Sequence, residues 1–462
     1  MELASTTAYK KGIPNLRINY TPHPITDRPA DVCRKFLEGN DAHTGKPLLQ
    51  GIIDSITKPV SADDKKGGFM QRDPRPRLLP PDTADNLQQL FIDSNFSDGG
   101  PVILPTEAKV AEMLKATSHS PDEIVGTMRP SPPHEAWEYN VEMVAVNAVM
   151  AGAKPEYFPV ILAIASTGTS SLFSSTSSFA RMAMINGPVA EEIGMNPGIG
   201  ALGPFNQANT TIGRAWTLVS KNLGGSGDPG ETFLGSMGNP LSYNNMCFPE
   251  NEEKLPKGWK PFHVQKGFEE SDSVVSLFSG WSYNNIAWYS HLTYQEVMTH
   301  WLSNFFSYGT RQALFIIDPV TAEYLYDQGF DSKEKLADYF AKNSTTPAWL
   351  FWNPRLKQLA EEGREPYASY LELGEGAQIP QSRYIRRAPR GKPASKDEPQ
   401  TGSGRPFFPE TLEDENSIEI VVTGGGTNTY WGGGKKVAHS PKDWLFNGGC
   451  GFKPHPPRFL ML

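Results

Sequence analysis

The chain has 462 residues, more than the roughly 250–300 that one hydrophobic core usually serves, so its length predicts two domains or one elaborated domain. A formal net charge of −8, with 383–390 the only concentrated basic stretch, argues against nucleic acid as a partner. The three cysteines (Cys33, Cys247 and Cys450) lie far apart, which argues against a disulfide scaffold and a cysteine zinc site. The sequence shows no signal-peptide pattern and no long apolar run, which argues against a membrane partner. These features predict a cytoplasmic protein.

Residues 1–100 are rich in Pro, Asp and Lys and show weak hydrophobic periodicity. We therefore expect an extended N-terminal arm with one short helix at 48–56. Ordering such a long irregular segment loses conformational entropy that only further contacts can offset. The arm is expected to wrap over a neighbouring subunit or over its own domain, which predicts a homo-oligomer.

Two capped helices are predicted in the next part of the chain. Thr106 is an N-cap residue type that follows a short apolar run at 101–105, which predicts a strand and then a helix. A second helix is predicted at 134–152, with Gly152 as its C-cap. Residues 157–165 are almost continuously apolar, which indicates a strand buried on both faces. The positions expected to be buried are Val110, Met113 and Leu114 in the first helix and Val141, Val144, Ala145 and Ala148 in the second.

The remaining elements set the expected fold class. Strands are predicted at 273–279, 313–317 and 419–422, and helices at 293–306, 320–328 and 332–342. This alternation predicts an α/β fold with largely parallel sheets, arranged as two lobes with a cleft between them. The predicted division is an extended arm at 1–100, a first lobe with the main site motifs at 101–290, a second lobe at 291–430 that includes a charged loop at 353–417, and a C-terminal tail at 431–462.

The stretch at 185–253 is dense in Gly, Asn and Glu, residues that favour unusual backbone turns and polar sites. A helix is predicted from Thr210 to about Leu223, and Arg214 lies in its first turns, where its guanidinium can bind a carboxylate or phosphate. The alternative is a capped helix whose arginine pairs with a neighbouring acid. The residues predicted to bind substrate are Asn186, Asn206, Asn209, Thr210, Arg214, Asn251 and Gly425.

Gly425 belongs to a glycine-rich segment at 423–434 that follows the predicted strand at 419–422. In α/β proteins, ligands bind at the carboxyl ends of the strands. The segment has neither the G-x-G-x-x-G spacing with a following helix nor the Lys-Ser/Thr of a P-loop, so nucleotide binding is not indicated.

Carboxylates supply the chemistry that the sequence suggests most strongly. Glu142, Glu250 and Glu252 are predicted to be catalytic, and a divalent metal ion is possible with Glu142, Glu253 and His134 as ligands. Such an ion would relieve the repulsion between neighbouring acids. One alternative is a metal-free site with a protonated glutamate as general acid, and another is that these acids lie on the surface.

Cys247 is a candidate nucleophile because it lies in a polar, Asn-rich context. No histidine is close to it in sequence, so His263 or His291 would have to be brought to it by the fold. The alternative is a small buried hydrophobic residue, which is the more common role of a free cysteine.

The chain resembles the UGSC-motif proteins, a family associated with a selenocysteine-Gly-Ser-Cys motif. The matching segments are 141–152, 155–157, 186–188, 206–214 and 247–253, and the resemblance spans roughly 104–426. The redox motif itself is absent, because Gly-Gly-Cys-Gly at 448–451 has neither the paired thiols nor their order. The resemblance therefore implies that a separate chain supplies the motif, or that this chain does not need it.

Together these features predict an enzyme that cleaves a carbon–heteroatom bond in a small anionic organic substrate, by lyase or hydrolase chemistry. Polar residues gathered in glycine-rich turns carry this prediction. The alternatives are a subunit that presents substrate to a separate thiol or selenol redox protein, and a thiol-dependent oxidoreductase.

Overall fold

The fold is that of a computed structural model of the chain. It describes residues 15–22, 28–62, 77–128, 137–172, 180–229, 238–242, 246–280, 283–287, 292–305, 313–352, 354–363, 367–371, 376–380, 418–426 and 430–435, and a few positions between or before some of these ranges. The basic stretch at 383–390, Cys450 and most of the predicted loop at 353–417 and tail at 431–462 lie outside these residues.

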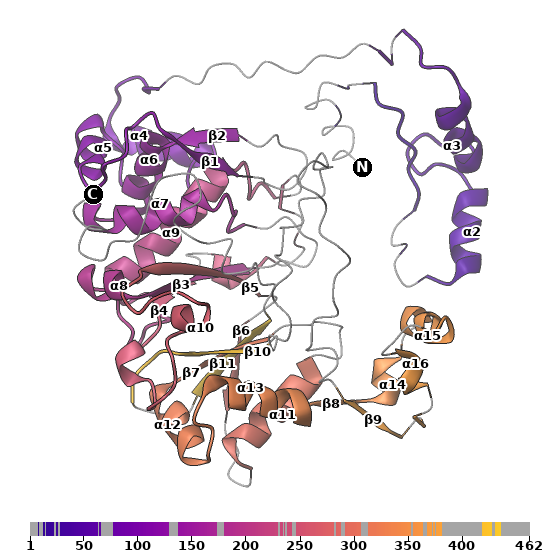
Figure 1. Ribbon diagram of the computed structural model, residues 1–462. Coiled ribbons are helices and arrows are strands. Elements are labelled where there is room, and N and C mark those ends of the chain that lie inside the picture. The colour runs from indigo at the N-terminus through magenta and orange to yellow at the C-terminus, as the bar shows by residue number, and fades with distance from the viewer. Residues whose placement is uncertain are drawn as a thin grey trace.

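Four layers of secondary structure make up the body of the molecule, in the order helices, sheet, sheet, helices (Figure 1). The first helical layer contains α5 (Glu107–Leu114), α6 (Val141–Ala151), α7 (Phe158–Ser166) and α9 (Gln207–Asn222). The two sheets contain β3 (Ala180–Asn186), β4 (Met246–Pro249) and β5 (Val274–Gly280), and then β6 (Tyr283–Ala287), β7 (Ala313–Ile317), β10 (Ile418–Val422) and β11 (Tyr430–Lys435). The last layer contains α11 (Tyr294–Phe305), α12 (Pro319–Asp327) and α13 (Lys333–Asn343).

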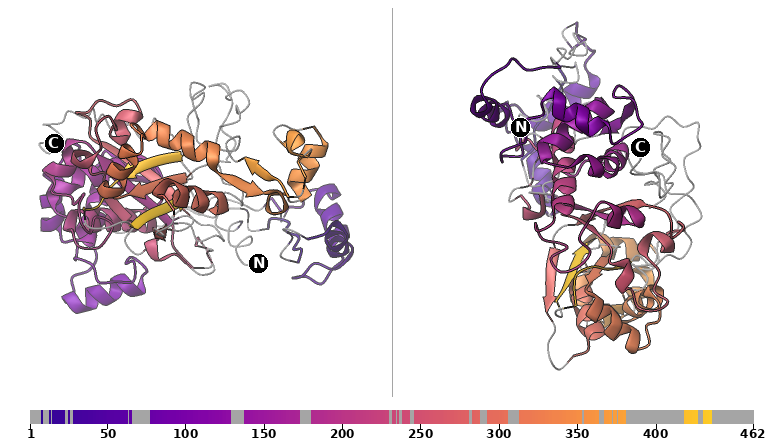
Figure 2. Two further views of the ribbon diagram at one scale, coloured as in Figure 1. Left: turned by 90° about the horizontal axis from the view of Figure 1, so that it is seen from below. Right: turned by 90° about the vertical axis from the view of Figure 1, so that its left-hand side faces the viewer.

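Shorter or peripheral elements surround these layers. They are α2 (Ala30–Glu38), α3 (Leu48–Thr57), α4 (Ala84–Asp93), β1 (Ile124–Met128), β2 (Trp137–Asn140), η1 (Pro155–Tyr157), α8 (Pro188–Glu192), η2 (Pro240–Ser242), η3 (Glu252–Lys254), α10 (Phe262–Gln265), β8 (Thr345–Pro347), α14 (Ala348–Phe351), α15 (Pro354–Glu361), α16 (Tyr367–Tyr370) and β9 (Gln378–Pro380). The helices α2 and α3 stand away from the four layers in Figure 1 and in the left view of Figure 2. None of the described helices combines the length and apolar composition that crossing a membrane requires.

Both sheets mix parallel and antiparallel pairs. In the sheet β4-β3-β5, β3 is parallel to β4 and antiparallel to β5. In the sheet β10-β7-β11-β6, β7 is parallel to β10, whereas β11 is antiparallel to both β7 and β6. The predicted mixture of helices and strands is confirmed, but the prediction of largely parallel sheets is wrong for the described strands.

The two sheets share a hydrophobic core. Because successive side chains of a strand point to opposite faces, Ala183 of β3 packs toward the first helical layer and Met184 packs toward the second sheet. The core between the sheets contains Met182, Met184, Phe248, Phe262, Phe278, Leu314, Ile316 and Val421. Burying each such side chain contributes about 1.5–3 kcal/mol. The structure therefore places a packed core between the sheets, and it does not confirm the predicted two lobes with a cleft between them.

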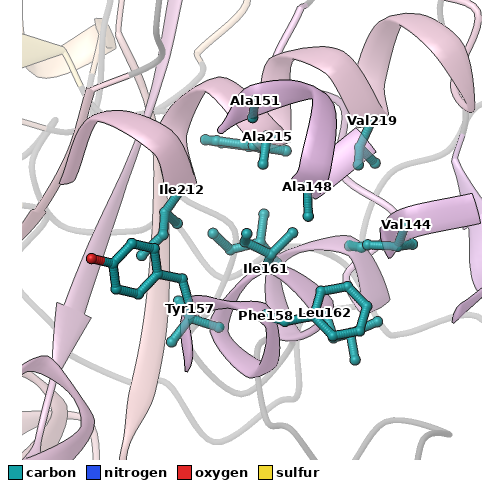
Figure 3. Close-up of a cluster of buried hydrophobic side chains, with 14 of the residues drawn as sticks. Val144, Ala148, Ala151, Tyr157, Phe158, Ile161, Leu162, Ile212, Ala215 and Val219 are labelled. Carbon is teal, nitrogen blue, oxygen red and sulfur yellow. The ribbon is translucent and has the colours of Figure 1, made fainter. Parts of the chain in front are cut away.

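The first helical layer is stabilised by caps and by close packing of α6, α7 and α9, whose apolar side chains point toward one another (Figure 3). Asn140 caps α6 by accepting a hydrogen bond from the Met143 amide, and Gly152 ends that helix with a left-handed φ of 83°. Thr106 caps α5 in the same manner. The predicted caps at Thr106 and Gly152 are thus confirmed.

The strand predicted at 157–165 is wrong: Tyr157 ends the short helix η1, and the residues after it form helix α7. Every residue from Phe158 to Ala165 is buried, so the segment lacks the polar face that would reveal its helical period. Pro159 lies in the first turn, where proline suits a helix and where its missing N–H costs no hydrogen bond. The strand predicted at 101–105 is also wrong: Ile103 instead donates its N–H to the carbonyl of Met150 in α6.

Candidate functional site

The carboxyl ends of four strands lie together at one edge of the two sheets. The parallel strands β3 and β4 end there at Asn186 and Pro249, and the parallel strands β7 and β10 end at Ile317 and Val422. The Asn251 amide donates to the carbonyl of Val422 at 2.7 Å and so joins the two sheets. Polar side chains that follow parallel strands commonly form ligand sites.

Glu250 is the buried centre of this edge. Its side chain is 0% exposed and pairs with Lys333, which is 2% exposed, at 2.7 Å between Oε1 and Nζ. Glu250 also accepts hydrogen bonds from Asn186 Nδ2 at 2.8 Å, from the Phe262 amide at 2.6 Å and from the Val422 amide at 3.4 Å. A buried carboxylate is tolerated only with such donors, because burial removes its hydration.

Asn186 links Glu250 to a second carboxylate, Glu252. Its Nδ2 also donates to Glu252 Oε1 at 2.8 Å, and the Gly187 amide donates to the same oxygen at 2.8 Å. Gly187 has φ 84° and ψ −174°, a conformation that side chains disfavour. The Glu252 side chain is 28% exposed, so it connects the buried network to solvent.

His263 lies beside Glu252 and is fully buried. Its Nδ1 is 3.7 Å from Glu252 Oε1, which is too far for a hydrogen bond. Among the described residues, neither ring nitrogen of His263 has a hydrogen-bond partner, and the same holds for the buried Oδ1 of Asn186. The edge therefore combines two acids, a lysine and two incompletely bonded polar groups.

Asn251 and Gly425 are predicted to bind substrate, and the structure shows them holding the loop after β10. Asn251 Nδ2 donates to the Gly424 carbonyl at 3.1 Å. Gly425 lies so close to Ile199 that a Cβ at this position would be 2.0 Å from Ile199 Cγ1. A larger residue at 425 would therefore require the exposed Ile199 side chain to move, and substrate binding by Asn251 or Gly425 stays a prediction.

Asn206, Asn209 and Thr210 lie at the start of α9. Asn206 is the N-cap, and its side chain accepts a hydrogen bond from the Asn209 amide. Asn209 bonds the preceding loop through the Asn196 amide and the carbonyls of Asn196 and Ala201. The buried Thr210 hydroxyl has no hydrogen-bond partner within the described part of the chain. The two asparagines hold the loop and helix together, which is a structural role.

Arg214 is paired with an acid, as the structural alternative predicts. Its Nε and Nη2 donate to the two carboxylate oxygens of Asp98 at 2.8 and 2.9 Å, and Nη2 also donates to the Pro101 carbonyl at 2.7 Å. Burial would raise the pKa of the Asp98 carboxyl, but the hydrogen bonds and charge of Arg214 outweigh burial and lower that pKa below its ordinary value. The guanidinium is therefore occupied, and the described geometry gives no support to anion binding by Arg214.

Replacing Asp98 by asparagine should flatten the pH dependence of stability in acid. Because the pKa is lowered in the folded state, the carboxylate contributes stability above the unfolded pKa of about 3.9, and this contribution disappears as the pH falls through the folded pKa. Between about pH 5 and 3, the unfolding free energy of the wild type should fall more steeply than that of Asp98→Asn, as measured by urea unfolding. Asp93→Asn, at an exposed position, serves as the control, and equal slopes for Asp98→Asn and the wild type would refute the assignment.

The three predicted metal ligands are not brought together by the described residues. Glu142 lies on α6 and pairs with Arg77, with Nη2 2.7 Å from Oε1. Glu253 is exposed, and His134 lies outside the described residues. Glu142 is separated from the strand-end network because α6 belongs to the first helical layer (Figure 1). The structure therefore does not place Glu142 with Glu250 and Glu252, as a shared catalytic site would require.

Cys247 points into the hydrophobic core beneath the first helical layer. Burial raises the pKa of its thiol well above the ordinary range, so the thiolate that a nucleophile requires is disfavoured. The packing matches the alternative role of a small buried hydrophobic residue.

Lys333 was not identified from the sequence as a site residue, and His263 was considered only as a partner for Cys247. One signal for Lys333 was present: it follows Ser332, the N-cap of α13, and a lysine in the first turn opposes the helix dipole. Comparisons with protein-family models, with curated proteins and with solved structures found no match for the chain.

Proposed function

We propose that this protein is an enzyme that cleaves a carbon–heteroatom bond in a small organic molecule, by lyase or hydrolase chemistry, at the strand-end network around Glu252. The observation that carries the proposal is a pair of carboxylates joined by one amide, with Glu250 buried and paired with Lys333 and Glu252 partly exposed. Acid–base sites commonly hold titratable groups in different environments.

The two glutamates are assigned different roles. Glu250 is held by Lys333 and by backbone amides, so it fixes the geometry of the site. Glu252 reaches solvent and is oriented by the Asn186 side chain and the Gly187 amide, so it is the group that exchanges a proton with the substrate. In a lyase it would take a proton from the carbon adjacent to the one that bears the leaving group, so that a double bond forms as that group departs, and in a hydrolase it would take a proton from the water that attacks the substrate.

The geometry of the site gives no reason to expect an anionic substrate. The sequence-based reason for an anionic substrate was Arg214, whose guanidinium is engaged by Asp98. A thiol-dependent reaction at Cys247 is likewise disfavoured by the burial of that residue. The resemblance to UGSC-motif proteins remains a prediction, and with it the alternative of a subunit that presents substrate to a thiol or selenol partner.

Glu252→Gln should reduce turnover by about 10²–10⁴-fold, because the amide cannot exchange the proton. Activity would be screened with purified protein on a panel of small carboxylates, phosphates, esters and amides, with products identified by mass spectrometry in H₂¹⁸O. Incorporated ¹⁸O indicates a hydrolase, and a new double bond without ¹⁸O indicates a lyase.

Glu253→Gln is the matched control, since it removes the same charge at the next, exposed position and should leave turnover unchanged. Full activity of a correctly folded Glu252→Gln variant would refute the proposed role. If the wild type were inactive on the whole panel but became active with a thiol or selenol partner chain, the substrate-presenting alternative would be correct.

A further inference from the structure

Two buried polar groups next to Glu252 lack the partners that buried groups normally have. His263 is fully buried, and neither of its ring nitrogens has a hydrogen-bond partner among the described residues. Asn186 Oδ1 is also buried and also lacks a partner among these residues. The Asn186 amide is fixed by two hydrogen bonds from its Nδ2, to Glu250 and Glu252, so its oxygen cannot lie more than about 5 Å from Glu252 Oε1. Buried polar atoms without partners call for an explanation such as an ion or a water.

The charges at this edge do not balance. Lys333 neutralises Glu250 at 2.7 Å, whereas the donors to Glu252 among the described residues are uncharged. Lys266, which directly follows the short helix α10 that contains His263, forms an ion pair with Glu419 at 3.0 Å. The Glu252 carboxylate is therefore the negative group that a cation at this position would neutralise.

The separation between His263 and Glu252 is close to that of two ligands of one ion. A metal ion bound at about 2.0–2.2 Å by an imidazole nitrogen and a carboxylate oxygen holds these atoms about 3.3–3.6 Å apart in near-tetrahedral geometry. The observed distance from Nδ1 to Oε1 is 3.7 Å, beyond hydrogen-bonding range. Oε1 already accepts two N–H groups, so an ion bound there would displace one of these donors.

We propose that His263 Nδ1, the Glu252 carboxylate and Asn186 Oδ1 bind one divalent transition-metal ion of the Zn²⁺ or Mn²⁺ type. Imidazole favours these ions over Mg²⁺ and Ca²⁺, and water or substrate would fill the remaining positions. The described residues contain no group of three His, Cys, Asp or Glu side chains that could hold a metal. The third protein ligand of the proposed site is therefore the amide oxygen of Asn186. The inference rests on the proposed function and refines it: with Glu252 as a ligand, a water bound to the ion would exchange the proton assigned above to Glu252, and the ion would polarise a substrate oxygen.

Metal binding is measured without substrate, by isothermal titration of the chelator-treated full chain with Zn²⁺ and, separately, with Mn²⁺ and Mg²⁺. We expect one Zn²⁺ or Mn²⁺ per chain and binding at least tenfold weaker for Mg²⁺. His263→Gln and Glu252→Gln should each weaken Zn²⁺ binding at least tenfold. Glu253→Gln and His119→Gln are the controls and should bind like the wild type, since Glu253 is exposed and His119 pairs with Glu123.

Circular dichroism and urea unfolding of each variant identify any that fail to fold. If the buried His263→Gln variant does not fold, Glu252→Gln decides the outcome, because it is nearly isosteric and partly exposed. Absence of binding at millimolar Zn²⁺ and Mn²⁺, or binding that Glu252→Gln leaves unchanged, would overturn the metal site. If Glu252→Gln loses turnover while the active wild type binds no metal, the proposed enzymatic function stands and only the metal site is rejected.

Discussion

Lys333→Met should lower the free energy of unfolding by about 3–5 kcal/mol, because it leaves the Glu250 carboxylate buried without its counter-charge. The remaining donors to Glu250, from Asn186 and the amides of Phe262 and Val422, carry no full charge. Urea unfolding followed by circular dichroism measures the change.

The control is Lys335→Met, two positions along the same helix. Lys335 also forms an ion pair, with Asp331, but both side chains are more than half exposed, so stability should stay near that of the wild type. The double variant Lys333→Met/Glu250→Gln removes both charges and should be less destabilised than Lys333→Met alone. Equal stability of Lys333→Met and Lys335→Met would show that the buried pair is not formed.

Gly187→Ala should cost at least about 3 kcal/mol and displace Glu252. A Cβ at this position would lie 2.0 Å from the backbone oxygen of Asp272, and the backbone φ of 84° is already unfavourable for a side chain. Because the Gly187 amide donates to Glu252, any backbone shift that relieves the clash also moves the carboxylate.

Gly194→Ala separates the cost of the positive φ from the cost of the steric clash with Asp272. Gly194 also has a positive φ, of 66°, but a Cβ there would meet no atom within 4 Å. Its substitution should cost only about 1 kcal/mol in urea unfolding, which is the backbone contribution alone. A Gly187→Ala protein as stable as Gly194→Ala would mean that the close approach to Asp272 is absent.

Local signals predicted several of the helices whose ends carry caps, although the capped helix α4 was not predicted. The helix predicted from Thr210 to Leu223 is α9, Gln207–Asn222, and its N-cap is Asn206. The helices predicted at 293–306, 320–328 and 332–342 correspond to α11, α12 and α13, and the three later predicted strands correspond to β5, β7 and β10. These segments have one polar face or clear end signals, so their hydrophobic periodicity or their ends can be recognised in the sequence.

The elements that the sequence could not predict are those that tertiary packing decides. Helix α7 is apolar all round because it is buried on every side, and such a segment has no period to detect. The strand β11 contains Gly432–Gly434, which reads locally as a loop, yet it pairs with both β6 and β7. Strand direction was also not encoded locally, since it depends on the path of the intervening chain.

The sequence predicted the acidic and amide residues of the candidate site, but not the distant residues that pair with them. Asn186, Glu250 and Glu252 lie in the stretch that the sequence singled out, and the structure joins them. Lys333 is 83 residues from Glu250, and no local pattern shows that the two will meet. Arg214 illustrates the converse: its helix was predicted correctly, but its partner Asp98 is 116 residues away.

The order in which the chain is synthesised bears on the buried carboxylate. Glu250 is translated long before Lys333 and before Val422, whose amide also donates to it. At about 5–20 residues per second, a ribosome needs roughly 10–30 seconds to travel from Glu250 to Val422. During that interval the glutamate must remain hydrated, so we expect the inner strand β3 and the edge strand β4 to settle into their final packing only after β10 has emerged.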